Sequence, residues 1–177
     1  MITIISIIIL FSAKEEIYAN QQNTPLPPSP SFEEKFAEAG YKSVEESVKE
    51  FENYFNCDVK LPRVTPAISF THRFGSFYED KRYNTNHSLD IRYVNKDVRE
   101  NIYKIDIRPI KNKLNFKGKE GKEYTLQDGG KAFYFESHQF NFLVFEKNDL
   151  QYLLGIYREV TNVEMPNTLV RIANSVE

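Results

Sequence analysis

Two acidic residues, Asp90 and Asp106, have the spacing to lie side by side in a sheet. They fall in two segments in which apolar and charged residues alternate, 89–94 and 103–108. A hairpin of these segments puts both carboxylates on its outer face, where a carboxylate pair can act as acid and base in glycoside cleavage. Three basic residues share that face, namely Arg92, Lys104 and Arg108. Charge pairing across the hairpin is therefore the simpler interpretation.

The three histidines form a zinc site only if the fold brings them together. Three imidazole groups are a common set of catalytic zinc ligands. However, His72, His87 and His138 each fall on or beside a different predicted strand, and no two have the separation of a ligand pair. We interpret them as ordinary sheet or turn residues and expect no metal site and no cofactor.

Other common catalytic signatures are missing from the sequence. It contains no GxSxG turn, no HExxH helix and no P-loop. Cys57 is the only cysteine, and the neighbouring Asp58 does not supply the positive surroundings of a reactive thiol. We interpret Cys57 as a small buried apolar residue. We therefore expect a protein that is not an enzyme, with a hydrolase as the less favoured alternative.

A basic stretch follows the hairpin, from about residue 108 to residue 122. Gly118 and Gly121 interrupt it and predict turns. Its lysines could contact anionic lipid headgroups or wall phosphates, and a solvated loop is the alternative. The candidates for this anionic contact are Lys111, Lys113, Lys117 and Lys119. The stretch lacks interleaved aromatic residues and the net charge of the chain is −2, so nucleic acid is not an expected partner.

Aromatic residues are concentrated in three predicted strands, 131–136, 140–146 and 150–157. If the sheet curves, their rings could line a cleft for an apolar ligand such as a lipid chain. Ordinary packing of a core under helices is the alternative. The candidates for ligand contact are Phe133, Phe135, Phe140, Phe142 and Tyr152.

The elements that position these residues predict one domain over residues 32–177. Ser43 and Glu46 form a capping box at the start of a helix with a single apolar stripe. A second helix is expected from about Pro166. About six antiparallel strands lie between them, the first ending near Gly75. This order predicts an α+β fold, with the amino-terminal and carboxyl-terminal helices on one face of a curved sheet.

The amino-terminal residues predict export from the cytoplasm. Residues 2–11 are almost entirely apolar, too few to span a bilayer but typical of a signal peptide. Residues 1–19 would form this signal, with cleavage after Ala19. A retained membrane anchor and an apolar first element of the fold are the alternatives. Residues 20–31 are rich in proline and predict an extended tether.

The carboxyl-terminal residues resemble a known family. Residues 142–156 (FLVFEKNDLQYLLGI) and 169–176 (LVRIANSV) resemble the close of an uncharacterised extracytoplasmic domain family of Gram-positive bacteria. In it a strand, an acidic turn and a tyrosine-bearing strand precede a helix with an Ile-Ala-x-Ser pattern. Residues 61–62 and 90–93 are similar to its earlier strands. Members are often tethered outside the membrane, sometimes beyond a membrane helix of an anti-sigma-like protein.

The resemblance implies a fold similar to that of lipoprotein carriers and a binding or sensing role, and it implies no catalytic residues. We therefore expect a secreted or surface-tethered, non-catalytic domain that binds an envelope protein or a lipid-like ligand. Contact with a membrane surface through the basic stretch is a further expectation. An envelope interaction domain without a small-molecule site is the alternative.

Overall fold

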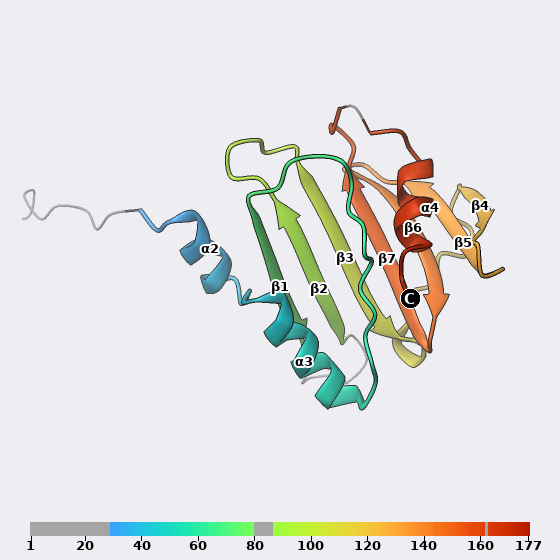
Figure 1. The fold of residues 1–177 in the computed structure, drawn as a ribbon, viewed down its shortest axis with the longest axis horizontal. Coiled ribbons are helices and arrows are strands. Elements are labelled where there is room, and N and C mark those ends of the chain that lie inside the picture. Colours follow the sequence, from blue (N-terminus) through green and yellow to red (C-terminus); the bar gives the residue numbers. More distant parts are fainter. Residues whose placement is uncertain (1–28, 80–86, 162) are drawn as a thin grey trace, which may run out of the picture. The chain divides into compact units, whose positions relative to one another are not determined.

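A seven-stranded antiparallel sheet organises the chain from residue 32 onward (Figure 1). The strands follow one another in the order β1-β2-β3-β7-β6-β5-β4. Their bounds are β1 His72–Tyr78, β2 Ser88–Val94, β3 Ile102–Pro109, β4 Lys122–Thr125, β5 Lys131–Glu136, β6 Phe140–Lys147 and β7 Leu150–Tyr157. The structure is a computed structural model that describes residues 29–79, 87–161 and 163–177. The proposed signal and most of the proposed tether lie outside the described residues.

Three α-helices and one short 3-10 helix accompany the sheet in the described part of the chain. They are α2 Phe32–Glu38, α3 Val44–Phe55, η1 Ile110–Asn112 and α4 Asn167–Ala173. Ser43 caps α3, and its side chain accepts a hydrogen bond from the Glu46 amide at 3.2 Å. The predicted α+β fold with a curved antiparallel sheet is confirmed, and the sheet has seven strands where about six were expected.

The main core lies between the sheet and the helices α3 and α4. Helix α3 packs on β1 and β2, and α4 packs on β6 and β7. Residues 57–70 pass over the same face between the two helices (Figure 1), and Val59 and Leu61 pack into this core. Cys57 packs against it as well, and burial raises the pKa of its thiol. Every other residue of the strands points into this layer because side chains alternate along a strand.

The opposite face of the sheet, here the second face, carries a smaller apolar cluster. Its buried members are Phe135, Phe142, Val144 and Leu153. Leu114 and Phe116 pack onto this cluster from the segment that follows β3. At the other end of the same face, α2 stacks Phe36 on Phe74 of β1, with ring centroids 4.2 Å apart. The second face is therefore covered at both ends by different parts of the chain.

Candidate functional site

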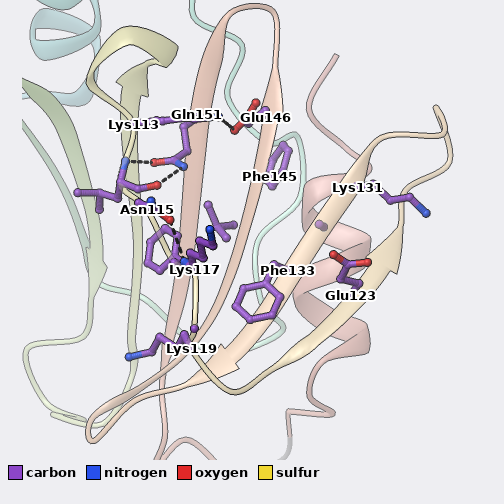
Figure 2. Close-up of a pocket in the computed structure, with 15 residues that line it drawn as sticks. Lys113, Asn115, Lys117, Lys119, Glu123, Lys131, Phe133, Phe145, Glu146 and Gln151 are labelled. Carbon is purple, nitrogen blue, oxygen red and sulfur yellow. Dashed lines mark hydrogen bonds and ion pairs between the residues drawn. The ribbon is translucent and has the colours of Figure 1, made fainter.

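A hollow of about 950 Å³ lies on the second face, beside the basic segment (residues 110–121). Figure 2 shows Lys113, Lys117 and Lys119 of this segment on one side, with Phe133, Glu123 and Lys131 on the other. The hollow thus lies between the basic segment and the hairpin of β4 and β5. Strands β6 and β7 lie between these two sides and contribute Val144, Glu146 and Gln151 to the lining.

The floor of the hollow is apolar. Phe133 and Val144 are direct neighbours across β5 and β6, and both lie on the second face. Phe116 of the basic segment places its ring 4.9 Å from that of Phe135. Leu114 completes this side of the hollow. Apolar floors with a few polar groups at the rim are typical of ligand sites.

A buried glutamine fixes the basic segment to the sheet. Gln151 of β7 is 4% exposed. Its Oε1 accepts a hydrogen bond from the Leu114 amide at 2.8 Å, and its Nε2 donates to the Leu114 carbonyl at 3.0 Å. Lys113 adds an ion pair with Glu146 at 2.8 Å. These contacts hold the wall of the hollow against β6 and β7.

The rim of the hollow is positively charged. Lys117, Lys119 and Lys131 line it, and none of the three forms an ion pair with any residue that the structure describes. Within the described part of the chain, the ammonium group of Lys131 donates only to the Thr125 hydroxyl, at 2.9 Å. Glu123 is the one further carboxylate in the lining besides the paired Glu146. The rim therefore favours a ligand with a negative group.

Four of the five aromatic candidates form one continuous row on the second face. Ring centroids are 5.9 Å apart for Phe133 and Phe135, 5.2 Å for Phe135 and Phe142, and 5.5 Å for Phe142 and Phe140. Phe133 lines the hollow, and the row continues from it across β5 and β6. Strand alternation brings these four rings to one face.

Tyr152, the fifth candidate, points to the helix-covered core. It is fully buried and stacks on Phe145 with centroids 5.1 Å apart. Burial raises the pKa of its hydroxyl to about 12. Tyr152 and Gln151 are consecutive in β7, so their side chains point to opposite faces of the sheet, and it is Gln151 that lines the hollow. The proposed site therefore does not include Tyr152.

The four lysine candidates separate into two places. Lys113, Lys117 and Lys119 line the hollow, and Lys113 is paired with Glu146. The ammonium group of Lys111 lies 5.2 Å from the ring centroid of Phe55, at the end of α3. Lys111 precedes the point at which the segment reaches the second face, so it stands apart from the other three.

The two aspartates lie directly opposite each other in β2 and β3. Arg92 donates to Asp90 from Nε and Nη2 at 3.1 and 3.0 Å, and Arg108 Nε donates to Asp106 at 2.6 Å. The charge pairing thus runs along each strand, whereas pairing across the hairpin was expected. Burial raises the pKa of Asp106. Each carboxylate thus has an arginine partner. Asp90 Oδ2 also accepts from the Tyr41 hydroxyl at 2.7 Å, and Asp90 Oδ1 is buried without a hydrogen-bond partner among the described residues.

The histidines lie in separate places. His72 Nε2 is 2.7 Å from Glu33 Oε1, His87 is buried against Tyr54 and Phe55, and His138 follows β5. Within the described ranges, no group of three or more histidine, cysteine or acidic residues is arranged to hold a metal ion. No helix of those ranges combines the length and the apolar character needed to cross a membrane.

Comparison with known proteins identifies no relative of this chain. No protein-family model, curated protein or solved structure matches it. The resemblance of residues 142–156 and 169–176 to an extracytoplasmic family therefore stays a prediction. The geometry of the hollow is the main support for a function.

Most residues that line the hollow are absent from the candidates that the sequence suggests, and Lys131 and Gln151 are the two of them with a polar role in the site. Strand alternation contains a signal for both. Lys131 lies two residues from Phe133, and Gln151 lies two residues from Leu153, so each pair shares a face of the sheet. The signal was incomplete, since nothing in the sequence shows that the basic segment returns to this face.

Proposed function

We propose that this chain is a non-catalytic binding domain that works outside the cytoplasm and holds an apolar ligand in the hollow. The observation that supports a ligand is the combination of an apolar floor with three lysines that lack an ion pair with any described residue. Packing alone gives no reason to gather unpaired cations around an apolar depression.

The charged groups of the hollow support binding in preference to catalysis. Its rim carries lysines. The paired aspartates Asp90 and Asp106 lie outside the lining of the hollow, and each accepts hydrogen bonds from an arginine. A general acid or base must be within reach of a substrate proton. The arginine contacts instead give the two aspartates a structural role.

Titration with the neutral fluorescent dye N-phenyl-1-naphthylamine tests the proposal. The dye is apolar and brightens when it leaves water. We expect saturable binding with one site per chain, and competition by 1-decanol because both ligands need the apolar floor. Fluorescence that rises linearly with dye, without saturation or competition, would contradict a ligand-binding hollow.

A further inference from the structure

Lys104 of β3 lies over aromatic rings, away from its acidic neighbour. Its ammonium group is 4.3 Å from the ring centroid of Phe140 and 4.8 Å from that of Phe142. Asp106 stands two residues along the same strand, yet the side chain of Lys104 crosses β7 to reach β6. The amine of Lys104 thus joins the far end of the aromatic row that begins in the hollow.

A glycine in β7 makes this crossing possible. Gly155 is paired with Lys104 on one side and with Phe142 on the other. A Cβ atom at Gly155 would lie 2.7 Å from Phe142 Cε1 and 3.1 Å from Lys104 Cε. Any side chain at this position would therefore separate the lysine from the ring.

The ammonium group of Lys104 has no ion-pair partner among the described residues. Arg92 pairs with Asp90 and Arg108 with Asp106, the two carboxylates on the same face, and neither carboxylate forms an ion pair with Lys104. Burial lowers the pKa of Lys104, while Asp90 and Asp106 raise it and Arg92 lowers it further. A cation in such surroundings gains most from an anion that replaces its lost hydration.

Lys119 reaches the same aromatic row from the basic segment. Its ammonium group is 5.0 Å from the ring centroid of Phe135, the neighbour of Phe142 in the row. Two ammonium groups from different parts of the chain therefore lie over adjacent rings of the row, and Lys119 also borders the hollow.

We infer that Lys104 and Lys119 together hold the carboxylate of a single-chain amphiphile whose apolar tail occupies the hollow. The inference rests on the proposed function and adds the chemical class of the ligand. A carboxylate can accept from both ammonium groups at once. An alcohol of the same chain length offers one oxygen and no charge, so it leaves Lys104 without a counter-ion.

The test compares decanoate with 1-decanol as competitors of bound N-phenyl-1-naphthylamine at neutral pH, using the full chain. The measured quantity is the ratio of their inhibition constants. We expect Lys104→Met to reduce the preference for decanoate over decanol by about 10-fold relative to the unmodified chain.

Lys119→Met should reduce the same preference. Acetate alone should not displace the dye. Lys96→Met, at an exposed lysine of the loop before β3, is the matched control and should leave the ratio unchanged.

The outcomes separate the inference from the proposed function. Failure of the dye to bind overturns the proposed function and the inference together. A dye that binds, with a competitor ratio that Lys104→Met leaves unchanged, overturns the inference alone. If Lys104→Met does not fold, as judged by thermal melting, Lys119→Met decides the question, because Lys119 is exposed. An unchanged ratio of inhibition constants in Lys119→Met then overturns the inference.

Discussion

At the scale of single residues, Gln151 connects the sheet to the wall of the hollow. It is almost completely buried. The oxygen and the nitrogen of its side-chain amide both form hydrogen bonds with the backbone of Leu114. A buried amide pair of this kind costs free energy when one partner is removed, because the other partner loses its hydrogen bonds without regaining water.

Replacement of Gln151 by methionine should therefore destabilise the fold. We expect Gln151→Met to lower the free energy of unfolding by about 1–3 kcal/mol, since the Leu114 amide and carbonyl lose their partners. Urea unfolding measures the change. Gln139→Met, at an exposed glutamine between β5 and β6, should change the value by less than about 0.5 kcal/mol. Equal effects of the two substitutions would mean that Gln151 does not hold the basic segment.

At the scale of elements, the close approach of α3 to β1 depends on Gly75. A Cβ atom there would lie 2.8 Å from Ser47 Cβ and 3.0 Å from Val44 Cα. Gly75 also forms two backbone hydrogen bonds with Lys42, just before α3. The helix therefore rests on the strand at a position without a side chain.

Addition of one methyl group at this position should push the two elements apart. We expect Gly75→Ala to cost about 1–3 kcal/mol, because the contact includes backbone that cannot rotate away. Thermal or urea unfolding gives the value. Ser76→Ala, on the opposite face of the same strand, should have little effect. A neutral Gly75→Ala would show that α3 and β1 are packed less closely than described.

The sequence predicted most elements but not all of their bounds. Alternation in 89–94 and 103–108 correctly placed the charged residues of β2 and β3 on one face. The first strand was expected to end near Gly75, whereas β1 runs from His72 to Tyr78. A glycine in a strand pattern suggests a strand end, but Gly75 lies inside β1 and makes room for α3. Local patterns do not reveal such a contact because the partner lies elsewhere in the chain.

The candidate site was predictable only in part for the same reason. Alternation puts Phe133, Phe135, Phe140 and Phe142 on one face, and composition marks the lysines of the basic segment. The pairing of β3 with β7 brings Lys104 opposite Gly155. Pairing between strands so distant in sequence cannot be obtained from periodicity, so neither Lys104 nor the return of the basic segment could be predicted.

The proposed function requires that the protein as a whole leaves the cytoplasm and binds its ligand outside it. The proposed signal, residues 1–19, supports this location through its apolar run. We expect the protein in the culture medium or the cell-surface fraction, with an intact mass that begins near Asn20. Mass spectrometry of the two fractions tests this. A full-length chain found only in the cytoplasm would contradict export and leave the binding proposal to stand on the hollow alone.

Dye titration of two phenylalanine variants shows whether the apolar floor of the hollow binds a ligand. Phe133→Ser removes a half-buried ring from the hollow, and Phe70→Ser removes a half-buried ring that packs on the helix-covered core. We predict that Phe133→Ser weakens the binding of N-phenyl-1-naphthylamine about 10-fold or more, since it loses the burial of an aromatic ring. Phe70→Ser should bind as the unmodified chain does. Equal dissociation constants for the two variants would contradict a ligand site in the hollow.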